Sequence, residues 1–410
     1  MRKIIALTLA LLLALTAVSC GAKTLDSELQ KITPDVNAPS KTHTVTESIT
    51  SLADFCIKLQ KSAANMSAGN SNTLLSPLSA YFALAMLTEG ANGDTLTQLE
   101  ATLGQTSGED VLALISHLTS LDNTTLNVAN SVWVDTLFEV RREYLDTLAA
   151  SYLAEGYKAQ LKYAEHDVNL WIEEHTNGLI RDMLNETALD NSVMAVVNAV
   201  YMNAKWETPF SAGATREREF YSADGSASSV DFMYKKSYFD VFETDEYIGV
   251  TLPYSDGVLE FVALMPNTVD MSTSDLLSIV AERGGWREIA RTAVSEEIKL
   301  YLPKFEHETT LSLTEILKEL GVTDAFSFTL ANFDKIADDI FLGGIMQSAV
   351  IKVDEAGTEA AAATFGTMAP TSAAPTTDPR TIEFNRPFAF AVVDTNSGAV
   401  LFAGEHNSAR

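Results

Sequence analysis

The chain has 410 residues, of which 46% are hydrophobic, so it is long enough to bury a large core in one big domain or two ordinary ones. Its 55 acidic and 28 basic residues give a formal net charge of −27 at pH 7, and no Lys or Arg occurs between Lys61 and Arg141. A field of that sign repels nucleic acid, anionic lipid and heparin-like polyanions, so none of these is an expected partner.

The first residues have the pattern of a targeting segment. Arg2 and Lys3 precede an apolar run that ends near Leu15 and is too short to span a bilayer comfortably. The motif Ala17-Val18-Ser19-Cys20 then resembles a bacterial lipobox, in which the Cys carries lipid after cleavage. This predicts a lipoprotein signal peptide at 1–19 and a protein anchored by lipid at Cys20 to a bacterial membrane, at the cell surface or outside the cell. The alternative is an ordinary secretory signal with an incidental Cys.

The polar residues 20–44, which include Pro34 and Pro39, predict a flexible tether behind the lipidated Cys. If Cys20 carries lipid, Cys56 has no partner for an intrachain disulfide. Cys56 lies at helical spacing from Leu52 and Leu59, which predicts a small buried hydrophobe and not a reactive thiol.

From about residue 45 the chain mixes helix and strand patterns. Ser76-Pro77 is a strong helix start, and the apolar residues 78–87 that follow predict a buried helix. Further patterns predict a helix near 49–59 and one at 311–320, strands at 128–134, 192–202, 258–265 and 298–302, and a hairpin that pairs 388–393 with 399–402. Because no internal linker divides these elements, residues 45–410 are predicted to form one large α+β domain.

Signatures of catalysis and metal binding are weak. The six histidines form no metal-ligand cluster, and no G-x-S-x-G elbow or glycine-rich phosphate loop is present. The sequence therefore predicts no enzyme activity, no cofactor and no metal site.

The unusual segment runs from about residue 355 to 380. No charged residue occurs between Glu359 and Asp378, and almost every side chain there is small. A low-complexity linker is one interpretation. Because the residues that follow are too few and too apolar to form a second domain, a long exposed loop between two core strands is the better one.

Taken together, residues 45–410 resemble the serpin family in the order of their motifs. Six stretches carry the resemblance: Asn72–Ser79 at a helix start, Gly90–Thr95, Asn198–Tyr201, Lys205–Phe210, Leu302–Phe305 and Phe384–Phe388. The resemblance implies three β-sheets, about eight or nine helices and an exposed reactive loop. It also implies a monomer that traps serine proteases in a covalent complex, with a non-inhibitory carrier or binding protein as the alternative.

In that family the cut loop enters a sheet as a new central strand. The resemblance assigns the hinge of the loop to small or outward-facing residues, which are Glu355, Gly357, Thr358, Glu359, Ala360, Ala361, Ala362, Ala363 and Thr364. Small side chains alternating onto one face suit a strand that must slide into a sheet. Gly357 permits the bend at its start.

The resemblance also places Ser76, Ser79, Asn198, Trp206 and Gln347 where the sheet opens. Members of the family usually have a His at the position of Gln347, hydrogen-bonded to the strand Asn. Gln347 is therefore expected to bond to Asn198, but it cannot titrate.

Two ways of counting place the scissile bond differently. Counting from Glu355 by the family's usual hinge length places it between Thr371 and Ser372, whereas counting back from Phe384 places it near Thr376. A cut at Thr376 would require two prolines to enter a central strand, which proline disfavours. The bond after Thr371 is therefore predicted, with Met368, Ala374 and Thr376 as alternatives. All four are uncharged, which predicts elastase-like or subtilisin-like target proteases.

Overall fold

A computed structural model describes residues 29–32, 50–66, 71–104, 107–190, 192–358 and 378–409. The predicted lipidation site and signal peptide lie outside the described residues. So do hinge residues 359–364 and all the candidate cleavage positions, from Met368 to Thr376.

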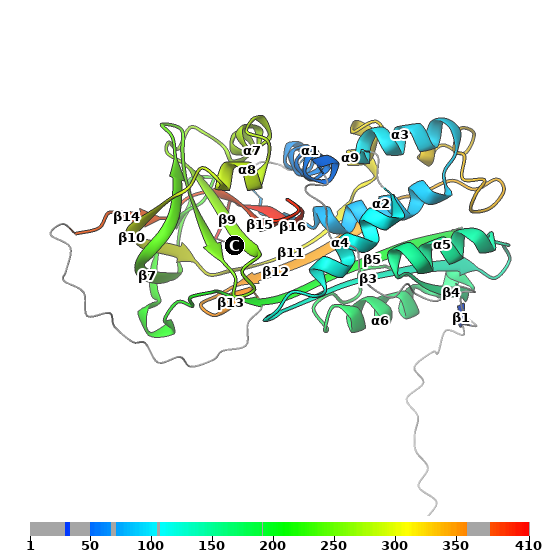
Figure 1. Ribbon diagram of the computed structural model, residues 1–410, viewed down its shortest axis with the longest axis horizontal. Coiled ribbons are helices and arrows are strands. Elements are labelled where there is room, and N and C mark those ends of the chain that lie inside the picture. The colour runs from blue at the N-terminus through cyan, green and yellow to red at the C-terminus, as the bar shows by residue number, and fades with distance from the viewer. Residues whose placement is uncertain are drawn as a thin grey trace, which may run out of the picture.

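Seven strands form the first sheet, which we call sheet A. In spatial order they are β1 (Gln30–Ile32), β4 (Glu155–Ala159), β3 (Thr124–Asp135), β5 (Met194–Lys205), β13 (Gly357–Thr358), β12 (Met346–Val353) and β11 (Phe305–Ser312). The long strands β3 and β5 are antiparallel and extend along the molecule in Figure 1. Sheet A therefore contains one very short strand, β13, between two long ones.

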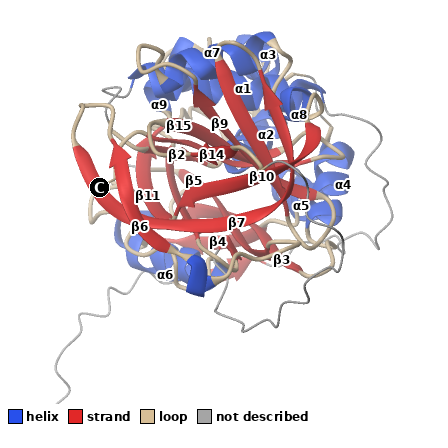
Figure 2. Cartoon of the chain, turned by 90° about the vertical axis from the view of Figure 1, so that its left-hand side faces the viewer, coloured by secondary structure: helices blue, strands red, loops and turns tan. Residues whose placement is uncertain are grey.

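The other strands form a second hydrogen-bonded set. It runs β14 (Thr381–Glu383), β10 (Val294–Pro303), β7 (Ala227–Glu243), β8 (Tyr247–Pro253), β9 (Leu259–Pro266), β15 (Phe388–Asp394), β16 (Val400–His406) and β2 (Thr73–Leu75), with β6 (Arg216–Tyr221) beside β7. Most of β7 pairs with β6 and β10, whereas its last four residues pair with β8. Figure 2 shows β7 crossing one end of the molecule. Two of the three predicted sheets are therefore continuous through β7.

Within the described ranges there are nine α-helices, in agreement with the predicted eight or nine. They are α1 (Thr50–Met66), α2 (Pro77–Gly90), α3 (Gly93–Leu103), α4 (Gly108–Leu118), α5 (Arg142–Tyr152), α6 (Glu165–His175), α7 (Thr273–Glu282), α8 (Trp286–Ala290) and α9 (Thr314–Glu319). Figure 1 shows α2 and α6 on opposite sides of β3 and β5. Helix α2 is apolar nearly all round and is almost entirely buried, as the sequence predicted.

Several predicted elements differ in their bounds. The helix predicted at 311–320 is shorter, because Leu311 and Ser312 still belong to β11 and α9 starts at Thr314. An apolar residue at a strand end and one in a first helical turn give the same sequence pattern.

The predicted tether is also not free throughout. Gln30–Ile32 form β1, which pairs antiparallel with the edge strand β4. A three-residue polar strand carries no periodic signal, so the sequence pattern could not show it.

Cys56 lies on α1 and is buried, as predicted, and burial raises the pKa of its thiol to about 12. Across the described ranges, no group of three or more His, Cys, Asp or Glu side chains is placed to hold a metal ion. The helices of the described ranges include none with the length and apolarity needed to span a bilayer.

Candidate functional site

Strand β13 is the start of the predicted hinge, and it lies in the middle of sheet A. Thr358 pairs with Ala204 of β5 on one side and with Val353 of β12 on the other. Only 2% of the surface of Thr358 is exposed. The sequence predicted an exposed loop from about residue 355, but the uncut chain already buries the first hinge residues between two strands.

A tight turn reverses the chain from β12 into β13. The Asp354 N–H donates to the Gly357 carbonyl at 3.0 Å, and Asp354 Oδ1 accepts from the Ala356 N–H at 2.8 Å. Gly357 is required here, because a Cβ at this position would lie 2.0 Å from the Ala204 carbonyl oxygen. The glycine expected to allow a bend therefore allows a close approach to β5.

Glu355 fastens this turn to the residues that precede β6 and β11. Its carboxylate accepts a hydrogen bond from Thr215 Oγ1 at 2.7 Å and pairs with Lys304 Nζ at 3.0 Å. Burial raises the pKa of Glu355, but the hydrogen bonds from Thr215 and Lys304 outweigh it, so the pKa lies below the usual value. The Glu355 carboxylate is consequently charged at neutral pH and stabilises the turn.

Trp206 and Tyr254 form the floor of the hinge. The Trp206 indole N–H donates to the Asp354 carbonyl at 2.9 Å, and its backbone N–H donates to the Ala356 carbonyl at 3.0 Å. The Trp206 ring stacks on Tyr254 with centroids 4.7 Å apart. The Tyr254 hydroxyl in turn lies 2.5 Å from Thr358 Oγ1. This bond satisfies both hydroxyls in a buried place and holds Thr358 in the sheet.

Beyond the two residues of β13, a gap separates β5 from β12 in sheet A. In the described part of the chain, β5 and β12 pair with β13 but not with each other. At the far end of the gap lies a cavity of about 310 Å³. It is lined by the start of β5, the start of β12 and one face of α2, and its lining includes Ser79, Asn198 and Gln347. The structure thus brings three of the predicted sheet-opening residues to one cavity.

The predicted hydrogen bond between Gln347 and Asn198 is not formed. Its Oε1 accepts from the Ser76 N–H at 3.0 Å, and its Nε2 donates to the Ser76 carbonyl at 2.7 Å. Both ends of the amide thus bond to the backbone of Ser76, at the start of α2, and not to Asn198. Ser76 also caps α2 by accepting from the Ser79 N–H at 3.3 Å.

Asn198 instead turns toward β3. Its Nδ2 donates to Asn130 Oδ1 at 2.7 Å and to the Ala129 carbonyl at 3.3 Å. Among the described residues, no donor reaches the buried Asn198 Oδ1. The open sheet therefore leaves one acceptor of Asn198 without a partner in the described part of the protein.

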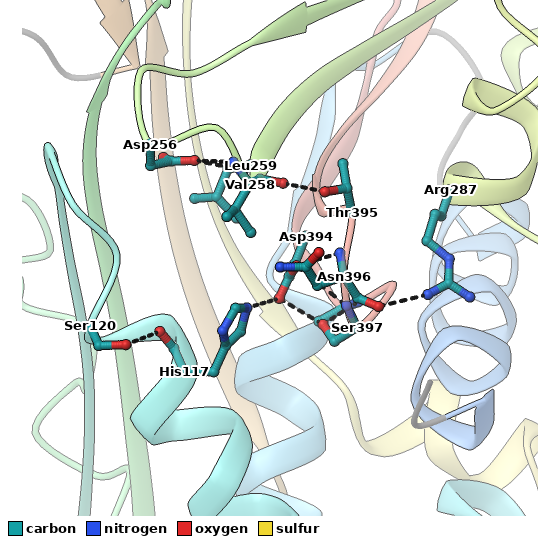
Figure 3. Close-up of polar contacts among 11 residues, drawn as sticks. His117, Ser120, Asp256, Val258, Leu259, Arg287, Asp394, Thr395, Asn396 and Ser397 are labelled. Carbon is teal, nitrogen blue, oxygen red and sulfur yellow. Dashed lines mark hydrogen bonds and ion pairs between the residues drawn. The ribbon is translucent and has the colours of Figure 1, made fainter. Parts of the chain in front are cut away.

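A Ser, His and Asp also meet away from this gap, at the turn between β15 and β16 (Figure 3). Both His117 Nε2 and Ser397 Oγ lie 2.8 Å from Asp394 Oδ2. Because the Ser hydroxyl bonds to the Asp and not to the His, and is buried, it has no general base to activate it. This cluster fastens α4 to the hairpin turn and is not a catalytic triad.

Two buried histidines join sheet A to the second sheet. His406 Nδ1 lies 2.9 Å from His307 Nε2, and at most 7% of either residue is exposed. Burial lowers the pKa of His307 to about 4, and burial and His307 lower that of His406 well below 6.5. Both rings are therefore neutral in the folded protein.

This pair predicts acid sensitivity. Unfolded histidines bind protons below about pH 6.5, whereas the folded His307 resists protonation down to about pH 4, so folding stability is lost as the pH falls between these values. The loss from His307 alone should be about 3 kcal/mol. We expect thermal unfolding temperatures to fall over this range in the wild type and much less in a His307→Val/His406→Val variant. Parallel curves for the two proteins would contradict the prediction.

Sequence reasoning missed several hinge residues. Tyr254, Thr215 and Asp354 had no motif to mark them, since each acts through a contact with a distant part of the chain. Lys304 lies within a motif that carried the family resemblance, but the motif did not reveal its pairing with Glu355.

Sheet A is thus a sheet whose central strands β5 and β12 are joined only by the short β13, which is the start of a long loop. Comparisons identify the family. The family model described as serpin (serine protease inhibitor) matches residues 50–409. A serine protease inhibitor of Cyanea capillata is 31% identical over 353 residues, which cover 82% of this chain and 91% of that protein.

Solved structures agree. The native state of the thermophilic serpin tengpin is 30% identical with a TM-score of 0.79, and the alignment covers 92% of this chain and 97% of that one. Native protease nexin-1, solved with heparin, is 26% identical with a TM-score of 0.78, and the alignment covers 88% of this chain and 98% of that one. The chain belongs to the serpin family, whose members are typically serine protease inhibitors.

Proposed function

We propose that this serpin is a suicide-substrate inhibitor of serine proteases, in which the cut loop enters sheet A and traps the acyl-enzyme. The observation that carries the proposal is the position of β13. Gly357 and Thr358 already pair with β5, and Thr358 also pairs with β12, so the first residues of a new central strand are already in the sheet.

The register of β13 indicates where the following residues would lie. Continuing this antiparallel pairing for six residues beyond Thr358 would place Thr364 opposite Asn198 of β5 and Gln347 of β12. The Thr364 hydroxyl would then meet the unsatisfied Asn198 Oδ1 at the mouth of the cavity. Insertion would therefore supply the donor that this acceptor lacks.

The energy of insertion is adequate for a trap. Each new strand hydrogen bond contributes about 1 kcal/mol, so a strand of ten or more residues supplies on the order of 10 kcal/mol. That free energy must be released before water hydrolyses the acyl-enzyme, and small hinge residues allow the strand to slide in quickly.

The proposed targets are elastase-like or subtilisin-like proteases, because the candidate residues before the cut are uncharged. Arg380, the nearest basic residue after them, pairs with Glu243 at 2.9 Å and with Glu296 at 2.7 Å. Its backbone carbonyl accepts from the Lys299 N–H beside β14. These contacts support an inhibitor that does not present Arg380 to a trypsin-like pocket.

The test is a gel. Incubation with an elastase should give a complex that survives boiling in SDS, together with a C-terminal fragment. Cleavage without any such complex would reject the inhibitor and favour a non-inhibitory serpin that acts as a binding or carrier protein.

We also propose that the protein is anchored to a bacterial membrane, at the cell surface, through lipid on Cys20. Most of a Cys20→Ser variant should move from the membrane fraction to the soluble fraction, because acyl chains supply most of the binding energy of such an anchor. Radiolabelled fatty acid should enter the wild type and not the variant. A wild type that is soluble and unlabelled would reject the anchor.

A further inference from the structure

The short strand β1 determines where the anchor leaves the protein. Gln30 pairs with Lys158 of β4, which lies level with Val134 of β3 and therefore with Met194, the first residue of β5. Ile32 lies level with Val196, so the chain enters sheet A at the end where β5 begins. In Figure 1 this end lies far from β13 and β14.

Side-chain contacts hold β1 in place. Lys31 Nζ pairs with Glu155 and lies 5.6 Å from the centre of the Tyr157 ring. Glu155 also accepts from the Tyr157 hydroxyl at 2.6 Å and from Trp171 Nε1 at 2.9 Å. Ile32 packs against Gly156, where a Cβ would lie 3.0 Å from the Ile32 Cβ. The chain is therefore fixed to sheet A at β1. Leu29 follows Cys20 by nine residues, a length that can span at most about 30 Å between the lipid anchor and the folded domain.

Apolar side chains gather at the same end of sheet A. Leu137 is 88% exposed, and Leu29, Phe138 and Tyr163 are each about 40% exposed. We call these four residues the β1-end surface. One exposed apolar side chain is ordinary in a folded protein. Four exposed apolar side chains at the end of sheet A that leads to the lipid anchor are not explained by the fold.

One buried carboxylate presents this surface rigidly. Asp135 Oδ1 accepts from the Leu137 N–H at 2.8 Å, and Asp135 Oδ2 accepts from the Leu161 N–H at 3.0 Å. The Thr136 N–H donates to the Ala159 carbonyl at 3.0 Å. The turn that carries Leu137 and Phe138 is thereby fixed beside the 3₁₀ turn Leu161–Tyr163 that carries Tyr163.

The charges around the surface are mixed. Lys162 lies 5.7 Å from the Tyr163 ring, and Lys158 pairs with the exposed Glu139 at 3.8 Å. Leucine with aromatic rings and flanking lysines is the composition found at the interface between lipid and water. Lysine stems can extend their ammonium groups toward lipid headgroups while the apolar side chains enter the acyl boundary.

We propose that the β1-end surface rests on the bilayer to which the lipid holds the protein, so that the serpin is oriented and does not tumble on its tether. The contact adds to the lipid anchor and rests on that part of the proposed function, but it does not depend on protease trapping. The surface contacts the zwitterionic lipids of that membrane, since the net charge of −27 disfavours anionic ones.

The first test uses the lipidated protein in phosphatidylcholine vesicles whose acyl chains are brominated. A fluorophore on a Leu137→Cys variant should be quenched, whereas one on a Val269→Cys variant should not. Val269 is a matched control because it is 87% exposed and lies close to α7 in the chain. The buried Cys56 thiol will not compete for the label. Equal quenching at both positions would overturn the proposal, and so would crosslinking of two copies through position 137.

The second test needs no lipid anchor. The Cys20→Ser protein should bind phosphatidylcholine vesicles weakly, and a Leu137→Asp substitution should lower its partition by about tenfold, because each 1.4 kcal/mol of lost burial is a factor of ten. Val269→Asp should change nothing. An unchanged partition for Leu137→Asp would overturn the contact even if the lipid anchor is real. If Leu137→Asp lowers the partition as expected but the wild type carries no lipid, only the lipid anchor would be overturned.

Discussion

A Thr358→Arg variant should be cleaved by an elastase but should form no SDS-resistant complex, because it becomes a substrate. Thr358 lies between β5 and β12 with 2% of its surface exposed and its Oγ1 2.5 Å from the Tyr254 hydroxyl. An arginine cannot keep this place without burying an unpaired charge, which is unfavourable by several kcal/mol, so it would expel β13 from sheet A and oppose its re-entry when the cut loop inserts. Insertion would slow by well over tenfold, and hydrolysis of the acyl-enzyme would win.

Two control variants separate charge from the loss of a hydrogen bond. Thr358→Ala removes the bond to Tyr254 but keeps a small, uncharged side chain, so most of the complex should remain. Glu359→Arg places the same charge one residue further on, where the alternation of a strand turns it to the other face. An undiminished complex for Thr358→Arg would contradict insertion at this register.

Mass spectrometry of the C-terminal fragment from an elastase complex should show a chain that begins at Ser372. A cut after Thr371 leaves thirteen residues after Thr358 to enter the sheet, with only Pro370 near the end of the inserted strand. A cut at Met368, Ala374 or Thr376 would change the fragment mass and identify the alternative directly.

The same bond predicts a change of target. Thr371→Arg should give an inhibitor that traps trypsin-like proteases, with a gain of at least about thirtyfold in the rate of complex formation, since a buried charged pair in a pocket is worth about 2 kcal/mol or more. Arg380 already forms ion pairs with Glu243 and Glu296, so the wild type should show no rapid trypsin inhibition. Rapid inhibition of trypsin by the wild type, with a cut after Arg380, would overturn both the bond and the target class.

The sequence by itself determined the family, the single α+β domain and the approximate place of the hinge. These follow from local features: the order of six motifs, Ser76-Pro77 at a helix start and a long uncharged segment before the last hairpin. Such features depend only on residues near one another in the chain, so composition and spacing reveal them.

Only the tertiary structure decided which side chains meet. Gln347 was expected at Asn198, but its amide bonds to both backbone groups of Ser76, and no described residue donates to Asn198 Oδ1. Tyr254 holds Thr358 from more than a hundred residues away, and Gln30–Ile32 completes the edge of sheet A. A hydrogen bond or a three-residue strand is chosen by the reach and direction of groups brought together in space, and no spacing along the chain encodes that distance.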